Sequence, residues 1–113
     1  MKRTLIIALM AAASQLAYAG GNAGAGAEKS KACAACHGAD FNTPVSPDIP
    51  RLAGQHADYL ARTLTEYKSG ARKNALMSGQ TAALSAQDIQ DIAAYVGSLS
   101  GNLQVIRLHR LAN

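Results

Sequence analysis

The chain has 113 residues, of which 49% are hydrophobic, 4% aromatic and 16% charged. This length allows one small globular domain at most. The formal net charge is +4, but no basic stripe is interleaved with the few aromatic residues. We therefore exclude a nucleic-acid-binding domain, in which cations cluster on one face or along one helix.

The first residues have the layout of a secretory signal peptide. Lys2 and Arg3 form a short basic start, residues 5–13 are an unbroken apolar run, and residues 17–19 read Ala-Tyr-Ala, a small-x-small cleavage signal. A membrane span needs about 20 apolar residues, so the run is too short for an anchor. We predict export to the periplasm and cleavage after Ala19. Loss of Lys2 and Arg3 then lowers the net charge from +4 to +2.

The sequence that follows the signal peptide has three predicted parts. Residues 20–26 are rich in Gly, Ala and Asn and are predicted to be a flexible lead-in. A helix is predicted over residues 27–36, because Ala is frequent there and the acidic Glu28 lies near its start. Residues 38–54 contain all three prolines and are predicted to be an ordered loop without regular structure.

The clearest helix is predicted over residues 55–69. Its apolar positions recur at helical spacing: Ala57, Leu60, Ala61, Leu64 and Tyr67. Asp58 lies in its first turn and Lys68 in its last, where each charge complements the helix dipole. Gly70 follows directly and is a suitable C-terminal cap.

A loop is predicted over residues 71–84, followed by a last helix. Ser85 and Asp88 have the spacing of a capping box at the start of that helix. One of its faces is apolar: Ile89, Ile92, Ala93, Val96 and Leu99. No alternating run is long enough for a strand. The predicted fold class is all-α, with one domain over residues 27–100 and a C-terminal extension of unknown role over residues 101–113.

Residues 33–37 read Cys-Ala-Ala-Cys-His, the attachment pattern of haem c. Positions three and four apart share one face of a helix, so Cys33, Cys36 and His37 can all point at one flat ligand. The two thiols add to the vinyl groups of haem, and the imidazole reaches its iron. The sequence therefore predicts one covalently bound haem c per chain, with His37 as an axial iron ligand.

Three other uses of the cysteine pair fit the sequence less well. A structural zinc site needs four ligands, and the remaining histidines, His56 and His109, are too far apart in sequence to supply a second pair. A thioredoxin-like dithiol follows a strand, and none is predicted before the motif. A disulfide across three residues is strained. Haem attachment is the favoured interpretation.

A haem that carries electrons needs a second axial ligand. Both other methionines lie within the predicted signal peptide, so Met77 is the only thioether of the exported chain. Core packing is the ordinary role of a lone methionine. With haem attached at His37, however, the His/Met pairing of cytochromes favours Met77 as the ligand on the opposite side of the iron. Two filled axial positions would leave no place for a substrate.

Further motifs accompany the haem signature along the chain. In order, they are Cys33-Ala34-Ala35-Cys36-His37-Gly38-Ala39-Asp40, Pro50-Arg51-Leu52-Ala53-Gly54-Gln55, Tyr59-Leu60, Gly70-Ala71-Arg72-Lys73-Asn74, Met77, Leu84-Ser85-x-x-Asp88-Ile89 and Ala93-Ala94-Tyr95. Together they resemble the bacterial class I cytochromes c, both the small single-haem periplasmic carriers and one half of the tandem two-haem cytochromes c. The resemblance implies the class I cytochrome c fold, with three or more helices wrapped around one covalently bound haem.

The resemblance also implies roles for four more residues. Pro50 would accept a hydrogen bond, through its backbone carbonyl, from the ring N–H of the haem histidine. Arg72 and Asn74 would lie near the haem edge, where they hold the propionates or the Met-bearing loop, although a solvated loop is the alternative. Tyr95 would pack against the first helix beside Gly26.

Two features depart from the family pattern. Lys29 and Ser30 stand where large apolar residues usually precede the first cysteine. We therefore expect the first helix to pack less firmly than usual, with the Lys29 stem lying along apolar surface. The tail adds the basic residues Arg107 and Arg110 among apolar ones, and a loosely packed extension is predicted, with partner docking or membrane-surface binding as the alternative.

The predicted function is single-electron transfer in the periplasm between a membrane reductase and a terminal oxidase or reductase, by a monomer that is not an enzyme. Arg72, Lys73, Lys29 and Lys31 would steer it toward an acidic patch on these redox partners. Two alternatives remain. One is a haem subunit held permanently in a respiratory or dehydrogenase complex. The other is a peroxidase or gas-binding haem protein, which needs an open sixth position.

Overall fold

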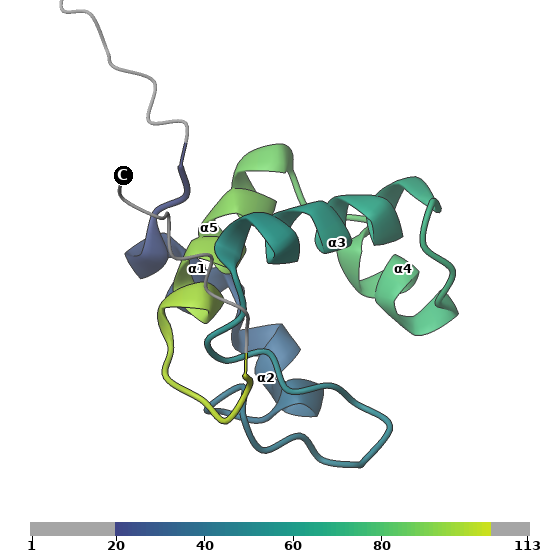
Figure 1. Cartoon of the computed structure of the whole chain (residues 1–113). Helices are drawn as coiled ribbons and strands as arrows, with labels where there is room; N and C mark the ends of the chain where they lie inside the picture. Colours follow the sequence, from purple (N-terminus) through teal and green to yellow (C-terminus); the bar gives the residue numbers. More distant parts are fainter. Residues whose placement is uncertain (1–19, 105–113) are drawn as a thin grey trace, which may run out of the picture.

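The computed structural model describes residues 20–104 (Figure 1). Over that range it contains five helices and no strand: α1 Ala23–Lys29, α2 Lys31–His37, α3 Ala57–Ser69, α4 Ala75–Thr81 and α5 Ala86–Ser98. The predicted all-α fold is confirmed. The predicted signal peptide and residues 105–113 of the predicted extension lie outside the described residues. None of the five helices is long and apolar enough to cross a membrane.

The start of the domain differs from the prediction, because α1 begins inside the expected lead-in. The Asn22 side chain accepts a hydrogen bond from the Ala25 N–H at 3.0 Å and so caps the new helix. Gly26 is buried against α5, where an added Cβ would lie 1.9 Å from the Asp91 carbonyl oxygen. The glycines were interpreted as a source of flexibility, but Gly26 is needed for a close approach between two helices. Ser30 then separates α1 from α2, so the single helix predicted over residues 27–36 is also wrong.

The α4 helix lies in a segment that was predicted to be a loop. Asn74 begins it, since its side-chain oxygen accepts a hydrogen bond from the Met77 N–H at 3.0 Å. Asn is a favoured residue at this N-terminal position. The loop prediction for residues 71–84 missed the helix because its short sequence contains Ser and Gly and has no long apolar stripe.

The core is formed where α3 and the loop of residues 38–54 pack on α5, and α1 also packs on α5. Its buried apolar residues are Phe41, Ala53, Leu60, Ala61, Ile89, Ile92, Ala93 and Val96. The apolar face predicted for the last helix is therefore confirmed, with Leu99 packed against it from the helix end. The capping box is present too, with both the Ser85 and Asp88 side chains bonded to backbone N–H groups. Tyr95 lies beside Gly26, as predicted, and meets Phe41 edge-on at 6.2 Å between ring centres.

Lys29 ties α1 to α5. Its Nζ lies 2.8 Å from Asp88 Oδ1 and 2.6 Å from Asp91 Oδ2. Asp91 is buried and also accepts hydrogen bonds from the Asn22 N–H and the Gln87 amide. The expectation of a loosely packed first helix is therefore wrong. Ion pairs and hydrogen bonds hold α1 on α5, in place of the large apolar side chains that the family pattern has there.

These contacts make the domain sensitive to acid. Hydrogen bonding to Lys29 is the main cause that lowers the pKa of Asp88 and of Asp91 to about 2, and it raises the pKa of Lys29. A carboxylate with a lowered pKa stabilises the fold above its unfolded pKa, and this stabilisation disappears as the pH falls through the folded value. The Lys29 contribution is present at neutral pH and is lost only above its ordinary pKa of 10.5.

Lys29→Gln is expected to lower the midpoint temperature of unfolding at neutral pH. Its stability should also fall less than that of the wild type as the pH is lowered from about 4 to about 2. The reason is that both aspartates lose the cation that favours their charged forms. Thermal unfolding of the haem-loaded protein across that pH range is the measurement. Lys31→Gln is the matched control, since within residues 20–104 the ion-pair partner of Lys31 is the exposed Glu28. Equal curves for both variants would contradict the prediction.

Candidate haem-binding site

The haem motif lies on α2, the short helix of residues 31–37. Cys33 and Cys36 are half-buried and His37 is buried at the helix end. The His37 Nδ1 lies 2.9 Å from the Pro50 carbonyl oxygen, the contact that the family resemblance implies. A carbonyl can only accept, so this contact places the proton on Nδ1 and leaves Nε2 free to bind a metal.

The loop of residues 38–54 holds Pro50 in place, and it is ordered without regular structure as predicted. The Phe41 carbonyl accepts hydrogen bonds from the Leu52 N–H at 2.8 Å and the Ala53 N–H at 2.9 Å, two and three residues after Pro50. Phe41 itself has φ 54°, an unusual value for a residue other than glycine. Asp40 supports this turn by accepting hydrogen bonds from the two N–H groups that follow Phe41.

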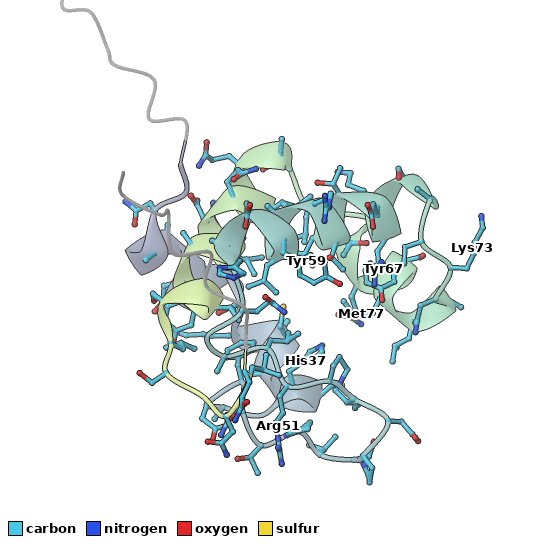
Figure 2. The ribbon with its side chains drawn as sticks, viewed as in Figure 1. His37, Arg51, Tyr59, Tyr67, Lys73 and Met77 are labelled. Carbon is cyan, nitrogen blue, oxygen red and sulfur yellow. The ribbon has the colours of Figure 1, made fainter. Side chains whose placement is uncertain are left out.

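An apolar cavity lies between α2, α3, α4 and α5. Cys33, His37 and Met77 all line it. Its remaining walls are Phe41, Leu52, Leu60, Leu64, Ile92, Ala93 and Val96. Figure 2 shows His37 below α3 and Met77 on the α4 side, across from each other. The fold therefore brings an imidazole and a thioether, 40 positions apart in the chain, to one water-poor space.

Hydrogen bonds hold both backbone polar groups of Met77. Its N–H donates to the Asn74 side chain at 3.0 Å, and its carbonyl accepts from the Thr81 hydroxyl at 2.9 Å. Thr81 is only 1% exposed. Sequence reasoning missed Thr81, because its spacing of four residues from Met77 is a signal only within a helix and a loop was predicted there. It placed Asn74 near the Met-bearing segment, and the structure shows that Asn74 begins the helix on which Met77 lies.

Arg72 lies outside the cavity wall, on the segment between α3 and α4. Its Nε is 3.3 Å from Glu66 Oε2, and its guanidinium carbon is 5.5 Å from the centre of the Tyr67 ring. Arg72 is therefore in contact with α3, while its side chain stays 40% exposed, and its role toward haem remains a prediction. Figure 2 shows Tyr59 and Tyr67 on the same side of the space as Met77.

The environment of Cys33 is unlike that of the reactive cysteine of a disulfide oxidoreductase. Burial raises the pKa of the Cys33 thiol, and the nearby Cys36 adds to the effect. Disulfide oxidoreductases instead depend on a cysteine whose pKa is lowered. Among residues 20–104, no three His, Cys, Asp or Glu side chains gather where they could hold a metal ion without further ligands.

Comparison with known proteins identifies the family. The sequence profile of cytochrome c matches residues 22–100, which is most of the chain. The chain belongs to the cytochrome c family. Members of this family carry covalently bound haem c, and the Cys-x-x-Cys-His motif on α2 fits that cofactor.

Several relatives of this cytochrome c chain are well defined. Cytochrome c4 of Pseudomonas aeruginosa is 48% identical over 83 residues, which cover 74% of this chain and 41% of that protein. Cytochrome c-554(548) of Halomonas halodenitrificans is 44% identical over 81 residues, which cover 69% of this chain and 96% of that protein. The crystal structure of reduced cytochrome c4 from Pseudomonas stutzeri matches with a TM-score of 0.68 and 41% identity, covering 74% of this chain and 48% of that one. The chain thus spans about half the length of its cytochrome c4 relatives.

The donor set in this structure suits haem c. The Cys33 thiol, an imidazole with its metal-binding nitrogen free and a thioether line one apolar cavity, and the Cys36 thiol lies on the same short helix as Cys33. Haem c is a flat, largely apolar macrocycle, so it requires apolar walls, thiols for covalent attachment and ligands for its central iron. The cytochrome therefore has one attachment cysteine, both candidate axial ligands and the apolar walls around one cavity, with the second cysteine on the same helix.

Proposed function

We propose that this cytochrome is a periplasmic carrier that passes single electrons between larger redox partners, with its iron bound by His37 and Met77. One observation carries the proposal, namely that the imidazole and the thioether line the same apolar cavity from different helices. Bound haem c supplies a metal centre that gains and loses one electron. A site with both axial positions filled suits transfer of electrons without binding a substrate.

Each residue of the site has a role in that proposal. Cys33 and Cys36 hold the cofactor through thioether bonds, which prevents its loss outside the cytoplasm. Pro50 fixes the tautomer of His37 and strengthens the imidazole as a donor. Met77 fills the remaining axial position, and its thioether favours the reduced, less charged state and so raises the potential. The apolar walls limit access of water, which lowers the reorganisation that accompanies a change of charge.

The proposed compartment rests on the first 19 residues, whose sequence has the layout of a signal peptide. Residues 101–113 are proposed to be an extension of the domain rather than part of its core. Both the export of the chain and its release as a free carrier belong to this proposal.

The charges proposed for partner docking are fewer than the sequence indicated. Lys29 and Lys31 pair with carboxylates on α5 and α1, and Arg72 pairs with Glu66. Of the four expected cations, Lys73 is exposed and forms no ion pair within residues 20–104. We therefore propose Lys73, four residues before Met77, as the cation that steers an acidic partner toward the site.

Stopped-flow oxidation of the reduced cytochrome by membranes from its source organism tests the carrier function. We expect the rate to fall as salt is added, because exposed charges are screened. Lys73→Gln should slow the reaction a few-fold at low salt and should match the wild type at high salt. Lys31→Gln is the control and should change little. A rate indifferent to salt, with co-purification in a fixed stoichiometric complex, would favour a permanently bound subunit instead.

A further inference from the structure

Arg72 makes an unusual number of contacts for a residue between two helices. Its backbone N–H donates to the Glu66 carbonyl at 3.1 Å, and its Nε lies 3.3 Å from the carboxylate of the same residue. Its guanidinium group lies over the Tyr67 ring. It also acts on Tyr59, which lies about two turns before Tyr67 on α3, and it is the main cause that lowers the pKa of Tyr59. Arg72 thus fastens the segment of residues 70–74 to Glu66 and Tyr67 of α3.

Arg62 offers a useful contrast. It also lies near Tyr59, with 5.7 Å between its guanidinium carbon and the ring centre, and its Nε is 4.0 Å from Glu66 Oε1. These two partners, Tyr59 and Glu66, belong to its own helix, so the Arg62 contacts seen among the described residues lie within α3. Arg72 has similar chemistry but connects α3 to the segment that leads into α4.

The position of α4 depends on that segment. Asn74 follows Arg72 by two residues and caps α4 through the Met77 N–H. With only seven residues, α4 is too short to be stable as an isolated helix, so tertiary contacts must hold it. It packs on α3, and in Figure 2 the rings of Tyr59 and Tyr67 lie on the Met77 side of the cavity. Displacement of residues 70–74 would therefore move the start of α4 and the methionine near it.

We infer that Arg72 is a positioning residue for Met77, and that with Tyr59 and Tyr67 it sets how readily an external ligand displaces the Met77 sulfur. This inference rests on the proposed axial role of Met77. It also distinguishes between the two roles that the family resemblance implies for Arg72, since its contacts run to the carboxylate and rings of α3 and so favour support of the Met-bearing segment.

The test measures binding of imidazole to the oxidised, haem-loaded protein by stopped-flow absorbance. Binding requires the sulfur to leave first, so its rate reports the population in which Met77 has moved away. Arg72→Gln should raise this rate about tenfold or more, because it removes a charge-assisted hydrogen bond and a cation–π contact together. Arg72→Lys keeps the charge but loses the planar fork, and it should give an intermediate rate. Arg62→Gln is the matched control and should stay within about twofold of the wild type.

A second variant guards against failure of Arg72→Gln to fold. Tyr59→Phe keeps the ring but removes the hydroxyl whose pKa Arg72 lowers, and Tyr59 is 37% exposed, so the fold tolerates the change. It should raise the imidazole rate by a smaller factor than Arg72→Gln. The weak long-wavelength absorption band of thioether-bound ferric haem is recorded for every variant before mixing.

The outcomes distinguish failure of the axial role of Met77 from failure of the positioning role of Arg72. If the wild type lacks the thioether band and binds imidazole at once, the proposed axial role of Met77 fails. If the wild type has the band but Arg72→Gln and Tyr59→Phe both bind imidazole as slowly as Arg62→Gln, Met77 remains the ligand and the positioning role of Arg72 is overturned.

Discussion

Replacement of both Cys33 and Cys36 by serine is expected to yield an exported chain without covalently attached haem. The thioether bonds require both thiols, and the cavity walls lose the cofactor that completes the core. On a denaturing gel stained for haem-linked peroxidase activity, the double variant should give no band. The chain should also accumulate poorly, because a small domain without its cofactor is readily degraded.

His37→Ala is expected to abolish stable holoprotein as well, because the alanine cannot bind the iron. His56→Ala is the matched control, since His56 is exposed and lies at the start of α3, outside the cavity wall. It should give haem-stained protein at the wild-type level. A haem band that persists in the denatured double cysteine variant would rule out covalent attachment at these positions.

Replacement of Met77 by alanine is expected to leave haem attached while opening the sixth position to water, cyanide or carbon monoxide. The reduction potential should fall by on the order of 0.1 V or more, a part of the roughly 0.8 V range over which axial ligands tune haem. The direction follows from the thioether, which favours the reduced state when it is present. Spectroelectrochemical titration of the purified variant provides the potential, and addition of carbon monoxide to the reduced form reports the open position.

Leu76→Ala is the control for that experiment. Leu76 precedes Met77 on α4, is 60% exposed and does not line the cavity. Leu76→Ala therefore removes an apolar side chain from the same helix and leaves the cavity wall unchanged. The reduction potential of the Leu76→Ala variant should equal that of the wild type. An unchanged spectrum and potential in Met77→Ala would instead point to His56 or His109 as the sixth ligand.

Local signals in the sequence were sufficient for much of this fold. The capping box at Ser85 and Asp88 and the apolar spacing of α5 depend on neighbours within one or two turns, so they can be interpreted without tertiary information. The haem motif is local in the same way, because its three functional side chains share one turn of α2. The family resemblance, carried by several motifs in order, then placed Pro50 beside His37, a contact that spacing alone would not predict.

The errors arose where distant parts of the chain meet. Gly26 belongs to a helix because it lets α1 approach Asp91, 65 positions later, and no local pattern shows that need. Lys29 likewise finds its partners on α5 rather than on its own helix. The α4 helix was missed because its stability comes from the Asn74 cap and from packing on α3, not from an apolar stripe.

The most direct test of a His/Met-ligated electron carrier is the visible spectrum of the purified, exported protein in both oxidation states, before and after addition of carbon monoxide. We expect one haem per chain, a single reversible one-electron transition and six-coordinate spectra in both states, with the thioether band in the oxidised form and no change when carbon monoxide is added to the reduced form. Rapid binding of carbon monoxide to the reduced wild-type protein would show an open sixth position and would contradict the account in favour of a gas-binding or peroxidase haem protein.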